Sequence, residues 1–376
     1  MRAEIYQRIA DVPADVWDGV LGDGTQAMTR SFWALLERSG LNDFDYRYAL
    51  FFDDAGRVVG ITSFYTVTTD IAIFAPTTLR KFLEIVRRVW PGFLKLRMLE
   101  CGTPITITSP PFICRASVAE DDMVRAIAEL LRATARAEGQ AFIVVRDFEP
   151  NAVGLERAFR LQGYHWVDSL PNTHLEIRWR TPREYLDSMR SYYRSKLQKH
   201  SRRNLDAGVR HELVEDVEPL AEKLCAQWMV VHEHASEFQR EVLTTEFYRR
   251  FCRELAPNAK ALMFYRQDAL AGHALLLRDG DMLRWLYVGR ATAANDGLYL
   301  YVAQKVVETA ITLGAKRLEM GLTTYAVKQD LGAEVTPIKI AVRASWGVIN
   351  PFVGLGYWVL NRVPRHSGRP VFKSMS

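Results

Sequence analysis

The apolar and polar positions between residues 283 and 335 change their period several times, and each change predicts a new element. Residues 283–288 have the pattern of a strand and lead into a loop at 289–297. A long helix is predicted next. The apolar residues that recur in it at helical spacing are Tyr299, Ala303, Val306, Ala310 and Leu313. Gly314 then stands where helices commonly end in the left-handed conformation.

A short strand at 317–320 and a shorter helix at 325–331, closed by Gly332, complete this stretch. The order strand, loop, helix, strand, helix, strand is typical of an α/β fold. A loop that enters a helix N-terminus offers free N–H groups and the positive end of the helix dipole. The loop at 289–297 therefore suits an anion such as a pyrophosphate, although an ordinary crossover without a ligand stays open.

The N-terminal half contains a similar run. A hairpin is predicted from strands at 46–52 and 58–65 with a turn at 53–56, and a short helix at 31–36 has Ser31 as a possible N-cap. Residues 96–114 suggest a strand and a buried loop. The elements that follow are a helix at 121–138, a strand at 142–145, a helix at 153–161 and a strand at 174–179, with Gly139 and Gly163 after the helices.

This order matches the order of the C-terminal half, so we predict one supersecondary plan used twice. A boundary is expected near 180–183. The predicted domains are 1–180 and 181–345, with the main site in the second, followed by an apolar segment and basic tail at 346–376.

The composition is that of a folded protein of 376 residues, which is enough for two domains. The net charge of +5 fits an anionic ligand or surface without requiring nucleic acid. The four cysteines show no CxxC spacing, so neither a zinc site nor a disulfide framework is predicted, and a reducing cytosol is the default. The N-terminus lacks the apolar run of a signal peptide.

Three segments carry a resemblance to a known family: SYYRSKLQKHSRRN at 191–204, GLYLYVAQKVVETAITLGAKRLEMG at 297–321 and YAVKQDLGAE at 325–334. In these the chain resembles the GNAT acyltransferase superfamily, in its tandem-domain, Fem-like branch. The resemblance implies a mixed α/β sheet in two tandem GNAT-like domains. Relatives of this kind include bacterial ceramide synthases and acyltransferases that act on products of oxoamine synthases, whereas Fem enzymes use aminoacyl-tRNA.

The function that the resemblance implies is N-acylation of an amine, with a long-chain amino lipid of sphingolipid metabolism as the candidate acceptor and an acyl thioester such as acyl-CoA as co-substrate. No metal is expected. The alternatives are a Fem-type ligase that depends on aminoacyl-tRNA and a non-catalytic lipid- or protein-binding member. Fem ligases often insert a long pair of antiparallel helices, and residues 217–255 are too short and too apolar for one.

The usual pyrophosphate loop of the family, Arg-x-x-Gly-x-Gly/Ala, is not intact in this chain. Its nearest counterpart is RATAANDG at 290–297, so Arg290, Asn295 and Gly297 are predicted to bind the cofactor. The segment 183–203 is rich in cations and poor in acids. Its basic residues are Arg183, Arg190, Arg194, Lys196, Lys199, Arg202 and Arg203.

This basic segment is either a solvated helix face or a surface for an anion: a cofactor phosphate, a lipid headgroup or a tRNA backbone. We assign Arg194, Lys199 and Arg203 to cofactor binding. No other nucleic-acid partner is expected.

Acyl transfer needs a base for the amine, donors for the oxyanion and a proton for the leaving thiolate. Glu319 is a candidate base, Tyr325 a candidate acid, and Lys328 a candidate for holding a phosphate or the oxyanion. Each also has a structural interpretation. Glu319 would then pair with Lys316 or Arg317, the tyrosine would pack in the core, and the lysine would be solvated.

His273 lies among apolar residues in a predicted strand. Such a histidine is more often a core residue than a base, but one that faced a cleft would suit general-base catalysis. His232 and His234 would diverge on a helix, which argues against a metal pair.

Residues 344–361 carry no charge, yet the run is short for a membrane span and is interrupted by Pro351 and several glycines. Four of its residues are types that favour a membrane interface: Trp346, Phe352, Tyr357 and Trp358. A basic tail follows, with Arg362, Arg365, Arg369 and Lys373. The pattern predicts a cytoplasmic protein at the inner face of an anionic membrane, or else a segment that completes the second domain.

Overall fold

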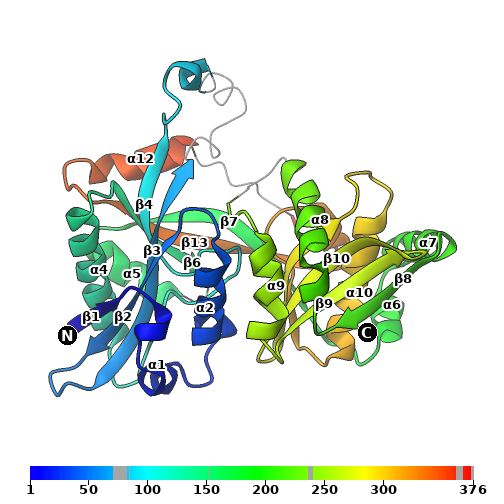
Figure 1. The fold of residues 1–376 in the computed structure, drawn as a ribbon, viewed down its shortest axis with the longest axis horizontal. Helices are drawn as coiled ribbons and strands as arrows, with labels where there is room; N and C mark the ends of the chain where they lie inside the picture. The colour runs from blue at the N-terminus through cyan, green and yellow to red at the C-terminus, as the bar shows by residue number, and fades with distance from the viewer. Residues whose placement is uncertain (71–82, 84, 151, 236–239, 361–366, 374–376) are drawn as a thin grey trace. The chain divides into compact units, whose positions relative to one another are not determined.

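The computed structural model describes residues 1–70, 83, 85–150, 152–235, 240–360 and 367–373 (Figure 1). The helices are α1 Ala14–Leu21, α2 Arg30–Ser39, α4 Glu120–Ala137, α5 Val153–Leu161, α6 Pro182–Ser188, α7 Ser191–Asp206, α8 Ala221–Glu233, α9 Thr245–Glu254, α10 Leu298–Thr312, α11 Tyr325–Asp330 and α12 Asn350–Leu360.

The strands are β1 Arg2–Tyr6, β2 Asp45–Phe52, β3 Val58–Asp70, β4 Lys95–Cys101, β5 Phe112–Cys114, β6 Phe142–Phe148, β7 His165–Glu176, β8 Val209–Val214, β9 Ala259–Arg266, β10 Ala269–Asp279, β11 Met282–Arg290, β12 Arg317–Glu319 and β13 Glu334–Ala344. Helices and a mixed sheet therefore make up an α/β fold, as predicted.

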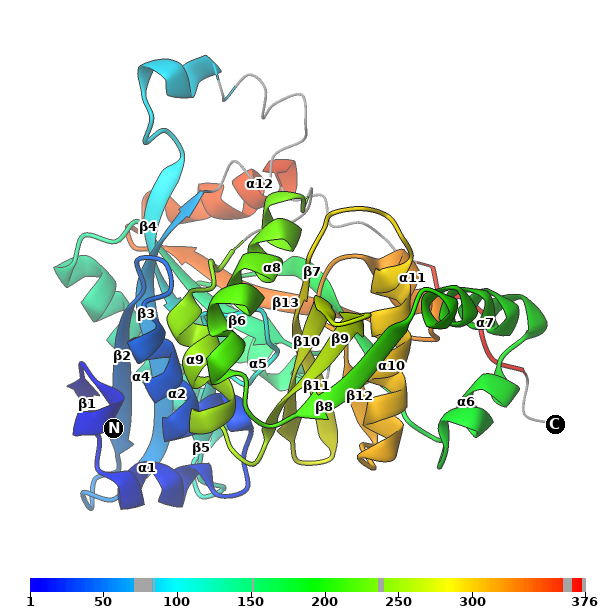
Figure 2. The same cartoon turned by 45° about the vertical axis from the view of Figure 1, so that its right-hand side comes forward.

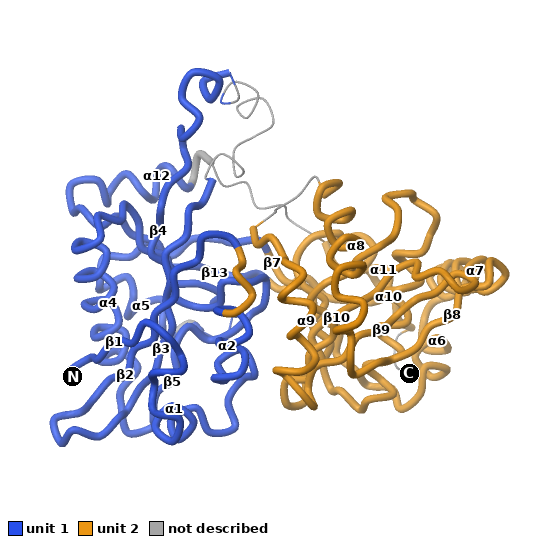
Figure 3. The backbone as a smooth tube through the Cα atoms, in the orientation of Figure 1, with its two compact units in different colours: residues 1–37, 42–170, 337–364 blue, residues 38–41, 171–336, 365–376 orange. Residues whose placement is uncertain are grey.

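The chain forms two compact units (Figure 3). Unit 1 consists of Met1–Glu37, Asn42–Leu170 and Pro337–Pro364, and unit 2 of Arg38–Leu41, Pro171–Thr336 and Arg365–Ser376. These units differ from the contiguous ranges predicted at 1–180, 181–345 and 346–376. The reason is that β7 begins in unit 1 and ends in unit 2, while β13 returns the chain to unit 1.

In unit 1 the strand order is β1-β2-β3-β4-β6-β13, with β5 added to β3. All of these pairs are antiparallel except β4 with β6. The helix α4 is apolar along one side, where Met123, Ile127 and Leu131 recur at helical spacing and are fully buried. They pack with residues of the sheet and with Phe159 of α5 in one core.

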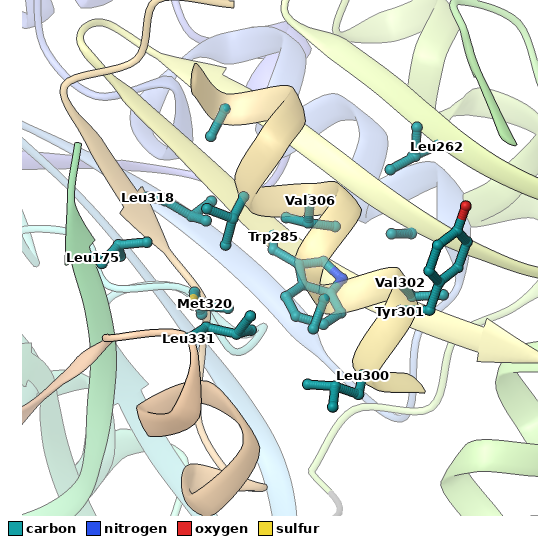
Figure 4. Packing of buried hydrophobic residues seen from close by; sticks show 14 of the residues in the cluster. Leu175, Leu262, Trp285, Leu300, Tyr301, Val302, Val306, Leu318, Met320 and Leu331 are labelled. Atoms are coloured by element: carbon teal, nitrogen blue, oxygen red, sulfur yellow. The ribbon is translucent and has the colours of Figure 1, made fainter. Parts of the chain in front are cut away.

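In unit 2 the strands β8, β9, β10 and β11 form an antiparallel meander, β12 joins β11 in parallel, and β7 joins β12 antiparallel. The helix α10 covers this sheet. Val302 and Val306 of α10 pack in the same core as Trp285 of β11 and Leu318 of β12 (Figure 4).

The prediction of one plan used twice is confirmed. The first copy runs α4, β6, α5, β7 and the second runs α10, β12, α11, β13. The glycine that follows each helix has a positive φ: 67° at Gly139, 81° at Gly163, 66° at Gly314 and 91° at Gly332. Only glycine adopts this conformation at little cost, which is why these positions could be located in the sequence.

Two local predictions were wrong. The strand predicted at 174–179 begins already at His165 and ends at Glu176, where its pairing with Arg317 of β12 ends. The helix α2 is capped by Thr29 and not by Ser31, because the Oγ1 of Thr29 accepts the N–H of Phe32 at 3.2 Å.

Candidate active site

In unit 2, the strands β11 and β12 pair over only part of their length. Their parallel register ends at Arg284 and Glu319, but β11 continues to Arg290. Beyond Arg284, therefore, the edge of β11 that faced β12 has no partner in the register of the described strands. The backbone groups of an unpaired strand edge can bind the amides of an extended ligand.

A β-bulge lies at the same point of β11. Trp285 is opposite Leu276 of β10 and Tyr287 is opposite Leu275, which leaves Leu286 as the extra residue. A bulge shifts the alternation of side chains. As a result, Trp285 stacks on Tyr299 of α10, whereas Tyr287 packs against α8 and α9. The indole N–H of Trp285 donates to the carbonyl of Tyr287 at 3.1 Å and holds the bulge.

The loop predicted to bind an anion leads from β11 to α10 and is exposed at 291–295. Gly297 is the N-cap of α10 with φ +82°. Arg290 donates to the carbonyl of Ala294 at 3.0 Å within the loop, and Asn295 is exposed. Asp296 already accepts the N–H of Leu298 at 3.0 Å, so one of the free donors of the helix end is occupied.

The basic helix α7 contacts this helix end. A Cβ on Gly297 would lie 2.7 Å from Nδ1 of His200, so only glycine fits there without displacing the imidazole. Lys199 and Arg203 are exposed, Arg194 is half-buried, and none of the three has an ion-pair partner among the described residues. Burial, together with the charges of Lys196, Arg203 and Lys199, lowers the pKa of His200. Uncompensated positive charge therefore lies beside the N-terminus of α10.

Glu319 is buried and engaged through both oxygens. Oε1 accepts Nδ2 of Asn172 at 2.9 Å, and Oε2 is paired with Arg284 on the neighbouring strand. The two partners considered from the sequence pair elsewhere: Lys316 with Asp281 at 2.5 Å, and Arg317 with Glu176 at 3.2 Å.

Tyr325 and Lys328 hold the turn that follows β12. The hydroxyl of Tyr325 donates to the carbonyl of Pro171 at 3.0 Å. The Nζ of Lys328 donates to the carbonyls of Gly321 at 3.0 Å and Leu322 at 2.6 Å. Lys328 is 3% exposed, so the interpretation of a solvated lysine is wrong.

His273 lies in the core of unit 2 and is fully buried. Its Nε2 is 3.0 Å from the hydroxyl of Tyr248, and its Nδ1 is 3.0 Å from Oε1 of Gln227. Burial lowers the pKa of His273 to about 3, which keeps the ring neutral. This arrangement is that of a hydrogen-bonded core residue and not that of a base facing a cleft.

Sequence reasoning missed a polar group beside the bulge. Oε1 of the buried Glu241 accepts the hydroxyl of Tyr287 at 2.7 Å. His232 is half-buried and stacks on Trp228 with ring centroids 4.5 Å apart. Burial lowers the pKa of His232, and the carboxylate of Glu241 acts in the opposite direction. A carboxylate, a phenol and an imidazole thus gather at the point where β11 leaves β12.

Within the described residues, no group of three or more His, Cys, Asp or Glu side chains is arranged to hold a metal ion. In the same part of the chain, no helix has the length and apolar character needed to cross a membrane.

A family model described as an acetyltransferase (GNAT) domain matches residues 190–329, the range that runs from the start of α7 into α11. This segment of the chain is therefore similar to GNAT domains. The open end of β11, its bulge and the N-terminus of α10 all lie inside the matched segment.

Solved structures with a similar fold include FemX, which is 12% identical with a TM-score of 0.56 over 91% of this chain and 97% of that chain. Another is the C-terminal domain (DUF2156) of a putative lysylphosphatidylglycerol synthetase from Agrobacterium fabrum, which is 9% identical with a TM-score of 0.54 over 92% and 94%. At these identities the likeness concerns the fold.

One curated relative is a putative 8-amino-7-oxononanoate synthase 2 of Mycobacterium tuberculosis, which is 25% identical over 317 residues. The match covers 82% of this chain but 41% of the relative, so this chain spans about two-fifths of that protein's length.

Proposed function

We propose that this protein is an N-acyltransferase that moves an acyl group from an acyl thioester to an amine. The observation that carries the proposal is the bulge at Leu286, at the point where β11 has separated from β12. A bulge residue outside the strand register, next to an open strand edge, can turn its backbone N–H toward the oxyanion of a tetrahedral intermediate. The strand edge itself suits the amide-containing arm of a thioester cofactor.

The donor that fits best is acyl-CoA. Its phosphates would lie at the exposed loop 291–295 and the N-terminus of α10, where helix dipole and backbone N–H groups favour anions. Arg290 and Gly297 shape this loop, and Lys199 and Arg203 of α7 add positive charge near it. Asn295 is exposed in the loop and is available as a further donor.

In the reaction, the neutral amine attacks the thioester carbon, the oxyanion forms and the C–S bond breaks. We assign the role of accepting the amine proton to Glu241, because Glu319 is committed to Arg284 and Asn172. Tyr287 donates its hydroxyl hydrogen bond to Glu241 and lies beside the bulge, so it orients this carboxylate. Tyr325 would protonate the leaving thiolate only after its hydroxyl leaves Pro171.

The acceptor class we favour is a long-chain amine, such as an amino ketone or the amino lipid of a ceramide-like product. Two observations support it. The sequence resembles ceramide-synthase-type acyltransferases, and the M. tuberculosis relative is named for the synthesis of a compound with an amine beside a ketone. Such acceptors partition into membranes, so we place the protein in the cytoplasm at a membrane surface.

A second candidate is a Fem-type ligase that takes its acyl group from aminoacyl-tRNA. The fold similarity to FemX and the uncompensated charge of α7 favour it. Such a ligase would differ from an acyl-CoA-dependent enzyme in requiring aminoacyl-tRNA as the donor.

The test is thiol release from acyl-CoA of several chain lengths, measured with and without a panel of amines. The Glu241→Gln variant should lose about a hundredfold in turnover. Glu222→Gln, an exposed glutamate on α8, serves as the matched control and should keep full turnover.

Thiol release that no amine stimulates, with equal rates for the two variants, would contradict the proposal. Product formation that requires charged tRNA in place of acyl-CoA would establish the second candidate.

A further inference from the structure

Two segments of unit 1 that are distant in sequence expose large apolar side chains. The first, called the arm here, comprises residues 85–94 before β4, in which Ile85, Val89 and Trp90 are exposed. The second is α12 with the turn before it. Its exposed residues are Trp346, Val348, Ile349, Phe352 and Leu355. Val89 is 90% exposed and Phe352 is 66% exposed, so neither is a core residue at the edge of its unit.

The outward face of α12 is fixed by contacts on its other side. Val353 is buried against β4, β6 and β13, and Tyr357 packs beside it. Nδ2 of Asn350 donates to the carbonyl of Gly163 at 2.9 Å, and Oδ1 accepts the N–H of Ala344 at 2.9 Å. Phe352 and Leu355 are therefore held outward by an anchored helix.

The arm is also anchored to the sheet. Both terminal nitrogens of Arg87 donate to the carboxylate of Asp70, at the end of β3, at 2.7 and 2.5 Å. Nε of Arg87 donates to the carbonyl of Phe93 at 3.0 Å, and the ring of Phe93 lies 5.5 Å from the ring of Trp90. These bonds fix residues 85–94 as an extension of β4, on whose side α12 also lies (Figures 1 and 2).

Among the described residues of these two segments, the charged side chains are all positive. No charged residue occurs in 344–361, and Arg88 of the arm and Lys95 at the start of β4 are exposed with no ion-pair partner among the described residues. From 71 to 97 the sequence contains six basic residues, Arg80, Lys81, Arg87, Arg88, Lys95 and Arg97, and a single acidic residue, Glu84.

The sequence suggested the basic tail as the source of positive charge at the membrane, but two of its cations bind groups of unit 2. Arg369 pairs with Asp330, and Lys373 donates to the carbonyl of Asp187 at 2.6 Å, both within unit 2. Arg362 and Arg365 lie outside the described residues. Among the described residues, Arg88 of the arm and Lys95 of β4 are exposed cations on this side of unit 1.

We propose that the arm and the outward face of α12 together form a docking surface for an anionic lipid bilayer. Exposed apolar patches of this kind mark interaction sites, and tryptophan in both segments suits the membrane interface. Arginine and lysine beside apolar side chains add attraction to acidic headgroups. A second copy of the chain is a poorer occupant, because a two-fold interface would bring cations of one sign together.

The experiment is flotation of the purified full chain with vesicles of phosphatidylcholine, with and without phosphatidylglycerol. The protein should float with the anionic vesicles. Val89→Ser with Trp90→Ser, and separately Phe352→Ser with Leu355→Ser, should each lower the vesicle-bound fraction about tenfold or more. Arg88→Gln with Lys95→Gln should weaken binding to anionic vesicles alone, and added salt should do the same.

The matched control is Leu161→Ser, which removes an exposed leucine of α5 in the same unit and should leave flotation unchanged. All changed side chains in the apolar pairs are exposed, so thermal unfolding should stay near that of the parent. The inference does not depend on acyl transfer, and flotation measures it without any substrate. The inference is overturned if the parent protein does not bind the vesicles, or if both double variants of the apolar residues float as the parent does. It is also overturned if sedimentation without lipid shows that the parent is a dimer and that these double variants are monomers.

Discussion

The two units are built on one plan but differ where the strand before the long helix ends. In unit 1 the connection from β4 to α4 is long and partly buried, with Thr103, Ile105 and Ile107 among its buried residues. In unit 2 the corresponding connection at 291–297 is short and largely exposed. The same fold thus has a long, buried connection before the long helix in one copy and a short, exposed one in the other.

The first turns of the two helices differ in the same sense. The first turn of α4 contains Glu120, Asp121 and Asp122, whereas that of α10 contains no acidic residue. Acidic side chains stabilise a helix N-terminus and repel a second anion. An anionic cofactor is therefore disfavoured in unit 1, and the difference supports the proposal that it binds at unit 2.

A second comparison concerns a buried ion pair. Each unit has one at the corresponding strands, but the acidic and basic residues have exchanged strands. In unit 1, Glu100 of β4 pairs with Arg146 of β6 at 3.6 Å. In unit 2, Arg284 of β11 pairs with Glu319 of β12. Because both pairs bridge the parallel strands of their units, we infer that Glu319 has a structural role first.

The largest expected effect tests this inference. Arg284→Met leaves Glu319 buried without its cation and should cost about 3–5 kcal/mol of unfolding free energy. Arg146→Met should cost a similar amount through Glu100. Urea unfolding measures both. If Arg284→Met unfolds like the parent while turnover falls, the pair in unit 2 serves catalysis and the parallel between the units fails.

Next in size is an acid sensitivity confined to unit 2, which holds every histidine except His165. Burial lowers the pKa of His273 to about 3 and that of His174 to about 4. A lowered pKa means that the folded form resists protonation, so the stabilisation is complete above pH 6.5 and is lost as pH falls.

Each such histidine should remove about 1.4 kcal/mol per pH unit between pH 6 and 4. The His273→Gln variant should show a shallower decline in unfolding free energy over this range than the parent. Parallel curves for the two proteins would show that His273 is not the sensitive group.

A third prediction compares two glycines at corresponding connections. Gly297→Ala places a methyl group against His200 at a backbone with positive φ, so it should raise the KM for acyl-CoA about tenfold. Gly102→Ala, at φ +119° with Arg146 Cβ at 3.3 Å, should lower Tm and leave this KM unchanged. Equal KM changes would remove the distinction between the two helix ends.

The smallest expected effect concerns α7. Lys199→Gln with Arg203→Gln should raise the KM for acyl-CoA a few-fold at low salt and less at high salt, because exposed charges are screened. Arg183→Gln on α6 is an exposed control. An increase that is the same at every ionic strength would mean that these residues act through the fold and not through their charge.

The element order was predictable because its determinants are local. Apolar periodicity and the glycines after each helix locate α4, β6, α10 and β12 without reference to distant residues. The span of β7 was not predictable from the same cues. Pro171 interrupts the alternation of that strand, and its C-terminal end pairs with β12, far along the chain.

The site was less predictable for the same reason. The loop at 290–297 and the basic helix were found from local patterns, but Glu241 lies in a connection without periodicity, and its partner Tyr287 is 46 residues away. The bulge at Leu286 depends on the register with β10. Likewise, the choice of Arg284 over Lys316 as the partner of Glu319 follows from which strands become neighbours.

The return of β13 to unit 1 has a consequence for synthesis on the ribosome. The sheet of unit 1 needs residues 339–344 to pair with β6, and these emerge only after nearly all of unit 2 has been translated. At about 5–20 residues per second, the edge of β6 stays without its neighbour for about ten to forty seconds. The N-terminal unit therefore cannot complete its fold first, and the nascent chain must stay protected from aggregation until both units close together.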